Sequence, residues 1–205
     1  MLEAINLACV RGDRTLFRGV SLSAGPGEAV RLAGENGSGK TSLLRILTGL
    51  SAPAEGDVRW NGEPIRAVRE EFGRALAYVA HANGVKDELN PVENLMFAGA
   101  IAGEIVGEEA AKTALRRVGL VGRDHLPTRY LSQGQKRRVS LARLFITPQA
   151  RLWLLDEPFT ALDVKAVGEL AGVIGEHLGR GGAVVFTTHQ EVPVRGGMLK
   201  TVVLG

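Results

Sequence analysis

Alternating apolar and polar positions at the start of the chain predict β-strands. Two such runs, Leu2 to Val10 and Leu16 to Ser23, are joined by a short Arg-Gly-Asp segment and predict an antiparallel hairpin. A third run, Ala29 to Ala33, predicts a strand that leads into a glycine-rich loop. The spacing becomes helical between Thr41 and Leu50, where leucine and isoleucine recur on one side. Asp57 to Trp60, followed by Asn-Gly, predicts an edge strand and then a turn.

The second half of the chain changes from helical spacing to alternating strands and helices. Pro91 to Pro148 carries no strand pattern, which predicts a helical subdomain over about 91–148. Beyond it, the apolar runs Leu152 to Leu155 and Ala183 to Thr187 flank a helical segment, Val164 to Leu178, and Leu199 to Leu204 predicts a last strand. Strands that alternate with helices form parallel sheets covered on both faces. The pattern therefore predicts an α/β fold with a mostly parallel core sheet.

Composition narrows the class of protein only slightly. The 205 residues suffice for one large domain or two small ones, and the net charge of +3 suits an anionic ligand, an anionic membrane surface or nucleic acid without selecting among them. The single cysteine, Cys9, excludes an internal disulfide, a thiolate zinc site and c-type haem attachment, and we expect a buried thiol. The opening residues lack the basic region and the cleavage site that would predict a signal peptide, and the longest near-apolar run, Leu95 to Gly103, is too short to span a bilayer. We therefore expect a cytoplasmic protein.

The glycine-rich loop matches the phosphate-binding pattern GxxxxGK[ST] in full. Its residues are Gly34, Glu35, Asn36, Gly37, Ser38, Gly39, Lys40 and Thr41, and Ser42 follows them on the predicted helix. The glycines let backbone N–H groups face a phosphate, and the helix adds its positive end. Lys40 would reach the β- and γ-phosphates, and the Thr41 hydroxyl would bind Mg²⁺. A predicted strand before the loop and a helix after it make an accidental glycine turn the poorer interpretation.

A second motif is the apolar strand Leu152 to Leu155, which ends in Asp156-Glu157. In nucleoside triphosphatases such a strand lies beside the phosphate loop, where Asp156 would hold Mg²⁺ together with Thr41. Glu157 would then polarise the attacking water as a general base. An apolar run followed by two acids is a weak signal alone, and the phosphate loop makes it strong.

A third motif, Leu131-Ser-Gln-Gly-Gln135, precedes a basic helix. Ser132 and Gln135 have the spacing of a capping box, which starts a helix without any further function. Ser132, Gly134 and Gln135 at a helix N-terminus would equally suit a phosphate. The chain would then contain two phosphate sites.

These motifs together resemble the ATP-binding-cassette (ABC) ATPases. The LSQGQ segment is similar to their LSGGQ signature, with Gln133 in place of a glycine, and Thr160 to Asp163 resembles their D-loop. His189 resembles their switch histidine. The resemblance implies a P-loop NTPase fold of ABC type in one domain over residues 1–205, with an N-terminal antiparallel β subdomain and an inserted helical subdomain. It also implies that ATP and Mg²⁺ are the cofactors, that Glu157, His189 and Lys40 act in catalysis, and that two copies enclose two ATP molecules between phosphate loop and signature.

Two positions depart from the family pattern. The family often places an aromatic side chain for adenine stacking where this chain has Arg11, and a guanidinium can also stack on a base. The strand Ala75 to Val79 is usually followed by a glutamine that contacts the Mg²⁺ shell, and this chain has His81 instead. We expect both residues to contact the nucleotide site.

His81, the loop after it and the LSQGQ variant resemble one branch of the family, the ATP-binding subunits of the haem exporter of cytochrome c maturation (CcmA family). That resemblance implies peripheral attachment at the cytoplasmic face of the bacterial inner membrane. It also implies integral membrane partners that handle the haem, and no nucleic acid partner. Alternatives are the ATPase of another small-molecule or lipid exporter, a soluble ATPase of iron–sulfur assembly or DNA repair, and a clamp that binds ATP without turnover. The short interval between phosphate loop and signature disfavours a repair ATPase, and Glu157 with His189 disfavours the clamp.

Overall fold

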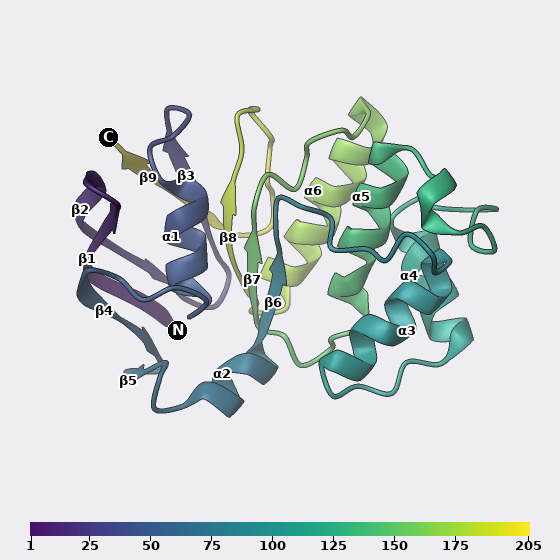
Figure 1. Ribbon diagram of the computed structural model, residues 1–205, viewed down its shortest axis with the longest axis horizontal. Coiled ribbons are helices and arrows are strands. Elements are labelled where there is room, and N and C mark those ends of the chain that lie inside the picture. Colours follow the sequence, from purple (N-terminus) through teal and green to yellow (C-terminus); the bar gives the residue numbers. More distant parts are fainter.

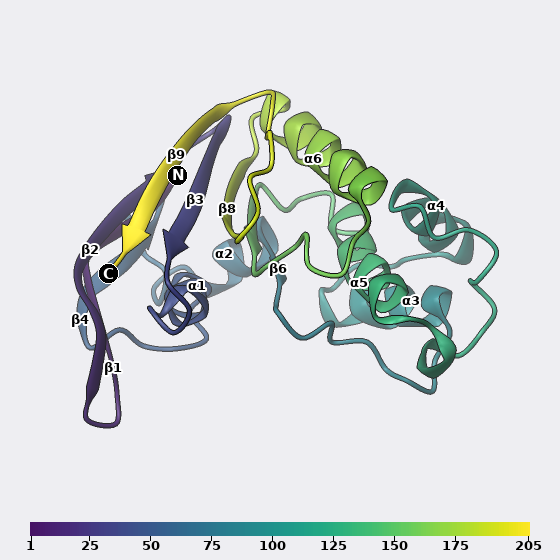
Figure 2. The same cartoon turned by 90° about the horizontal axis from the view of Figure 1, so that it is seen from above.

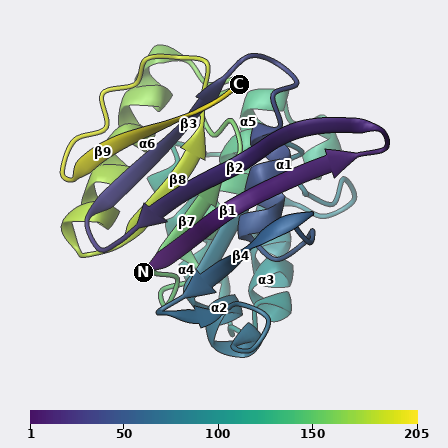
Figure 3. The ribbon, with the colours of Figure 1, turned by 90° about the vertical axis from the view of Figure 1, so that its left-hand side faces the viewer.

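The structure, a computed structural model, describes residues 1–205 and contains two β-sheets. The first is antiparallel, in the order β2-β1-β4-β5, and faces the viewer in Figure 3. Its strands are β1 (Leu2–Arg11), β2 (Arg14–Ala24), β4 (Glu55–Trp60) and β5 (Glu63–Pro64). The predicted hairpin is present as β1 and β2. The prediction that Asp57 to Trp60 forms an edge strand is wrong, because the two-residue strand β5 folds back after Asn-Gly and covers that edge.

The second sheet is parallel throughout, in the order β6-β7-β8-β3-β9. Its strands are β3 (Glu28–Gly34), β6 (Leu76–Val79), β7 (Leu152–Leu155), β8 (Ala183–Thr187) and β9 (Met198–Leu204). The carboxyl ends of β6, β7, β8 and β3 therefore meet along one edge of the sheet. In open α/β sheets ligands bind at this edge.

One face of the parallel sheet is covered by α1 (Lys40–Leu47) and, beyond it, by the antiparallel sheet (Figure 1). Side chains that alternate along the strands supply this layer: Val30 and Leu32 from β3, Leu152 and Leu154 from β7, and Ala183 and Val185 from β8. The helix adds Leu43, Leu44, Ile46 and Leu47, all at most 1% exposed. Cys9 is buried in the same cluster, as its apolar surroundings predict.

The opposite face of the sheet is covered by α6 (Val164–Gly179) and α5 (Gln133–Ala142). Here the alternate strand residues, among them Trp153, Leu155, Val184 and Phe186, pack against Leu170, Ile174 and Leu178 of α6. The prediction of a parallel sheet with helices on both faces is confirmed.

The helical segment forms a second arm of the molecule, seen at the right of Figures 1 and 2. It contains α3 (Pro91–Ile101), α4 (Glu108–Arg117), the short 3₁₀ turns Thr128–Tyr130 and Arg143–Phe145, and α5. A cluster of its own, with Leu95, Leu115 and Val139 at its centre, holds these elements together. One helix that the sequence pattern did not predict, α2 (Arg69–Ala75), leads into β6. None of the helices combines the length and apolar character that a bilayer crossing requires.

Candidate functional site

The carboxyl ends of the parallel strands frame an open cleft of about 650 Å³. Its lining consists of Arg11, Leu16, Asn36, Gly37, Gly39, Lys40, Thr41, Ser42, Arg45, His81, Asp156, Glu157 and His189. Almost the whole set is polar. The fold thus brings the phosphate loop, the two acids, His81, His189 and Arg11 together from segments far apart in the sequence. Leu16 and Arg45 also line the cleft and were not expected.

The phosphate loop connects β3 to α1 and bends tightly around its own backbone. Lys40 donates from Nζ to the carbonyls of Gly34 and Glu35, each at 2.8 Å. Gly39 has a φ of +98°, and a Cβ there would lie 2.9 Å from the ring of Phe17. A Cβ on Gly34 would lie 2.4 Å from the carbonyl of Leu204, so glycine is required at both ends. The loop's N–H groups are thereby held for an anion.

Asp156 lies at the end of β7 and is 1% exposed. Its Oδ1 accepts a hydrogen bond from the Thr187 hydroxyl at 2.9 Å, whereas its Oδ2 is buried without a hydrogen-bond partner. Thr41 lines the same cleft, and its hydroxyl takes no part in the hydrogen bonds of the protein. Carboxylate and hydroxyl oxygens are the hard donors that Mg²⁺ prefers, and Mg²⁺ needs few of them because it keeps waters and phosphate oxygens. The unpartnered Oδ2 and Thr41 therefore fit this ion.

Glu157 occupies a left-handed backbone conformation, with a φ of +49°. Its N–H donates to the Thr187 hydroxyl at 2.8 Å, so one threonine bonds both acids. Its Oε1 lies 3.3 Å from Nε2 of His189, at a distance of contact rather than of a well-formed hydrogen bond. A carboxylate that lacks a hydrogen-bond donor is available to accept a proton from water.

His81 and Arg11 are exposed side chains at two other sides of the cleft. His81 follows β6, and Arg11 ends β1 at the tip of the hairpin. Both positions are compatible with the expected contacts to a nucleotide.

The signature residues lie elsewhere. Ser132, Gly134 and Gln135 open α5 and are absent from the lining of the cleft. The capping box is formed in full: Gln135 N–H donates to Ser132 Oγ at 3.2 Å, and Ser132 N–H donates to Gln135 Oε1 at 2.9 Å. Gly134 packs so closely on the D-loop that a Cβ would lie 2.6 Å from the Ala161 carbonyl. The chain therefore does not bring its own signature and phosphate loop into one cavity.

Two further residues support the site, and the sequence did not identify their contribution. Thr187 bonds Asp156 and Glu157 as described, and Arg137 of α5 donates to the carbonyls of both acids at 2.7 and 2.9 Å. The basic run after Gln135 was the only sequence signal for Arg137, and a solvated helix face would give the same pattern.

Comparison with known proteins identifies the family. The model of the ABC transporter family matches residues 17–160. The chain is 56% identical over 193 residues, 94% of this chain and 90% of the relative, to the cytochrome c biogenesis ATP-binding export protein CcmA of Aromatoleum aromaticum. It is 52% identical to the CcmA protein of Dechloromonas aromatica over the whole length of both chains.

Solved structures agree on the fold. A structure of the ATP-binding subunit of an ABC transporter has a TM-score of 0.85 at 26% identity, covering 99% of this chain and 85% of that one. A dimeric ATP-binding cassette in a post-hydrolysis state with ADP and Pi has the same TM-score at 23% identity, covering 98% and 94% of the two chains. The predicted ABC-type P-loop fold is confirmed, and the chain belongs to the ABC transporter family and, within it, to the CcmA proteins of cytochrome c biogenesis.

Proposed function

We propose that the chain is the ATP-hydrolysing subunit of a membrane export complex that handles haem during c-type cytochrome biogenesis. The observation that carries this proposal is the single polar cleft that unites a complete phosphate loop, the Asp156-Glu157 turn and His189. Membership of the CcmA family supports the link to cytochrome c biogenesis.

Phosphate binding would depend on the loop between β3 and α1. Its backbone N–H groups and the N-terminus of α1 face the anion, and Lys40 would exchange its bonds to the Gly34 and Glu35 carbonyls for phosphate oxygens. Arg11 at the hairpin tip would stack its guanidinium on the base. Asp156 Oδ2 and Thr41 would hold Mg²⁺, which neutralises charge that develops on the phosphates.

Hydrolysis would start at the Glu157 carboxylate. It accepts a proton from a water molecule as the water oxygen forms a bond to the γ-phosphorus and the bond to the ADP oxygen breaks. His189 would orient this carboxylate and the transferred phosphoryl group, and its distance of 3.3 Å from Glu157 Oε1 supports the first role. The left-handed backbone at Glu157 directs its side chain into the cleft, which supports a role in the reaction.

A second copy of the chain would complete each site. Ser132, Gly134 and Gln135 lie outside the cleft of their own chain and form a helix N-terminus with an exposed serine. Such a terminus fits the γ-phosphate of a nucleotide bound to another copy. The proposed assembly is a symmetric pair with two ATP molecules at the interface.

Mixing two inactive variants tests this arrangement. Lys40→Ala removes the phosphate-loop lysine, and Ser132→Asp keeps a helix cap but places a negative charge where the signature would face a phosphate, so neither homodimer has an intact site. A mixed dimer has one intact site, formed by the phosphate loop of the Ser132→Asp copy and the signature of the Lys40→Ala copy. We expect the mixture to recover ATPase activity well above either variant alone. No recovery at concentrations where the wild type pairs would contradict the shared site.

We propose that a groove in the helical arm is the docking site of the membrane partner. It has a volume of about 250 Å³ and is lined by Val85, Lys86, Phe97 and Ile101 among others. Phe97 is 43% exposed and Ile101 70% exposed, although every residue of α3 from Leu95 to Ile101 is apolar or glycine. A helix of this kind is expected to be buried, so a partner that covers its free side is favoured.

The polar cleft is unsuited to the large apolar ring of haem, which supports its handling by the membrane partners. The chain would then be a peripheral protein at the cytoplasmic face of the bacterial inner membrane. Phe97→Asp should abolish co-purification with the membrane partners and c-type cytochrome production, while the purified variant retains its basal ATPase rate. Val121→Asp, at a 72% exposed position of the same arm outside the groove, is the matched control and should behave as wild type. If both variants produce c-type cytochromes at the wild-type level, that result would contradict this docking site.

A further inference from the structure

Arg137 is the most deeply buried charged side chain of α5, at 3% exposed. It forms no salt bridge. Instead Nη1 donates to the carbonyl of Ala80 at 2.8 Å, and Nη2 donates to the carbonyls of Asp156 and Glu157 at 2.7 and 2.9 Å. A longer contact, 3.5 Å, reaches the carbonyl of His81. One side chain thus joins α5, which begins with the signature residues, to the turn at Asp156 and Glu157 (the acid turn). It also joins α5 to the segment that carries His81.

The chemistry of these bonds requires arginine. A planar guanidinium presents donors in a fixed fork, so it can bond carbonyls of two separate segments at once. Burial lowers the pKa of Arg137 and the nearby charges of Asp156 and Glu157 raise it, and an arginine remains a cation under these conditions. Lysine would keep the charge but would lose the fork geometry.

The backbone of the acid turn needs support from surrounding side chains. Glu157 has a φ of +49°, a conformation that non-glycine residues adopt only when the surroundings fix it. Thr187 holds the turn from the β8 side through the Glu157 N–H, and Arg137 holds it from the α5 side through the Glu157 carbonyl. Together they fix the peptide groups on both sides of the Glu157 Cα.

We propose that Arg137 is a positioning residue for hydrolysis: it holds Glu157 and the His81 segment in fixed relation to α5. The first turn of α5 carries the signature, so the helix that would bind the partner's nucleotide also sets the general base of its own site. This inference rests on the proposed function, because it assigns a support to the base of that reaction.

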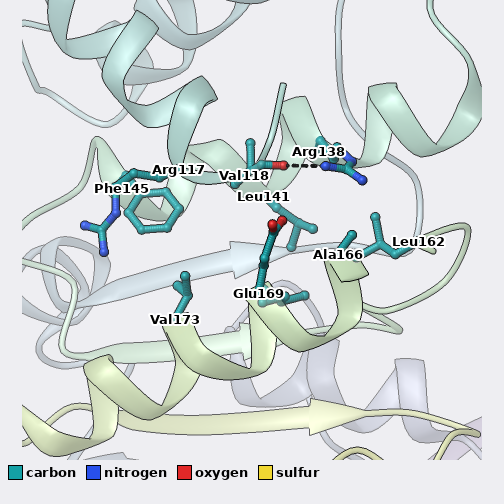
Figure 4. A pocket seen from close by; sticks show the side chains of 10 residues that line it. Arg117, Val118, Arg138, Leu141, Phe145, Leu162, Ala166, Glu169 and Val173 are labelled. Atoms are coloured by element: carbon teal, nitrogen blue, oxygen red, sulfur yellow. Dashed lines mark hydrogen bonds between the residues drawn. The ribbon is translucent and has the colours of Figure 1, made fainter. Parts of the chain in front are cut away.

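The neighbouring arginine offers a matched control. Arg138 points away from the cleft and donates to the carbonyls of Val118 and Gly119 at 3.1 and 3.2 Å. Figure 4 shows this bond to Val118 at the seam between α5, the end of α4 and α6. Arg138 also pairs with Asp163 at 3.1 Å. Its replacement removes an arginine with similar bonds from the same helix without touching the acid turn.

The test compares Arg137→Gln, Arg137→Lys and Arg138→Gln for kcat, for the Kd of Mg-ATP and for unfolding midpoint, with kcat expressed per ATP-binding site. Both Arg137 variants should lower kcat at least 10-fold and change the Kd less than 3-fold, since the phosphate loop is untouched. Arg138→Gln should lower the unfolding midpoint and leave kcat within about 2-fold. Wild-type kcat in Arg137→Lys, or the same kcat loss in Arg138→Gln, would overturn the proposal.

A double variant separates positioning from general destabilisation. If Arg137 acts through Glu157, Arg137→Gln should reduce the residual rate of Glu157→Gln by less than 2-fold, because the group that it positions is already absent. A further 10-fold loss in the Glu157→Gln background would refute action through Glu157. A wild-type chain without ATPase activity would contradict the proposed function itself, which keeps the two failures distinct.

Discussion

The imidazole of His189 lies 3.3 Å from the carboxylate of Glu157, although the two residues are 32 positions apart in the chain. Each follows the carboxyl end of its own strand, β8 for His189 and β7 for Glu157, and these strands are direct neighbours in the parallel sheet. The topology of the sheet therefore creates this contact, and the sequence order alone does not.

Replacement of His189 by alanine should lower kcat about 10- to 100-fold, because misplacing a reacting group by about an ångström has effects of this size. ATP binding should change little, since His189 is not part of the phosphate loop. Steady-state kinetics together with a nucleotide-binding titration measure both quantities. Gln190→Ala is the control, since that exposed side chain is next in the chain and outside the cleft. Equal kcat values for the His189 and Gln190 variants would refute the role of the contact.

Thr187→Val should both destabilise the fold and slow hydrolysis. The exchange keeps the shape of the side chain and removes the hydroxyl that bonds Asp156 Oδ1 and the Glu157 N–H. Leaving buried polar groups unpaired costs about 1–3 kcal/mol of folding free energy. Thr187→Ser keeps the hydroxyl and should retain most of the activity. Denaturant unfolding and kcat give the result, and a valine variant as active and stable as the serine variant would be inconsistent with the described network.

Because His177 is buried, we expect the folded protein to lose stability at acidic pH. It stacks on Trp153 with ring centroids 3.8 Å apart, and desolvation lowers its pKa from 6.5 to about 4, with the nearby Arg180 and Arg151 acting in the same direction. Between these values the unfolded state binds a proton that the folded state does not. Stability is therefore lost as the pH falls from about 6.5 towards 4, by about 1–3 kcal/mol from this residue.

The control for His177 is His177→Phe, which keeps a ring against Trp153 and cannot titrate. The free energy of unfolding should fall less steeply with decreasing pH in this variant than in the wild type. Parallel pH profiles between pH 6.5 and 4 would show that the histidine has no such effect.

His81→Gln, which restores the usual residue of the family, should hydrolyse ATP within a few-fold of wild type. His81→Ala should weaken the coupling between hydrolysis and the membrane partner, because His81 lines the cleft while Val85 and Lys86 of the same loop line the groove. The measurements for both variants are the ATPase rate, co-purification with the membrane partners and cytochrome c production. An alanine variant equal to wild type in all three would mean that His81 is an ordinary solvated side chain.

Local patterns predicted most of the elements because each pattern depends on nearby residues. The alternation in β1 and β2, the glycine loop before α1 and the apolar strands β7 and β8 were all identified from spacing. The phosphate loop and the acids were identified because their chemistry requires fixed residues at fixed positions. Elements without strong periodicity were missed, namely α2 and the two-residue strand β5, and β5 made the expected edge strand an internal one.

The site residues that the sequence did not identify depend on tertiary contacts. Arg137 and Thr187 belong to a basic run and to a strand end, patterns that occur on many surfaces and sheets without a role in a site. Only the packing of α5 against the acid turn makes Arg137 a buried donor to Asp156 and Glu157. The capping box at Ser132 was predicted correctly, because it depends only on the local spacing of Ser132 and Gln135.

The most direct test of Glu157 as the general base is the rate of phosphate release by Glu157→Gln at saturating Mg-ATP, with nucleotide affinity measured on the same preparation. Glutamine keeps the shape of the side chain and cannot accept the proton of the attacking water. We expect a rate about 10²- to 10⁴-fold below wild type, with the Kd of ATP changed less than about 3-fold. A wild-type rate in this variant would contradict the assignment of Glu157 as the general base.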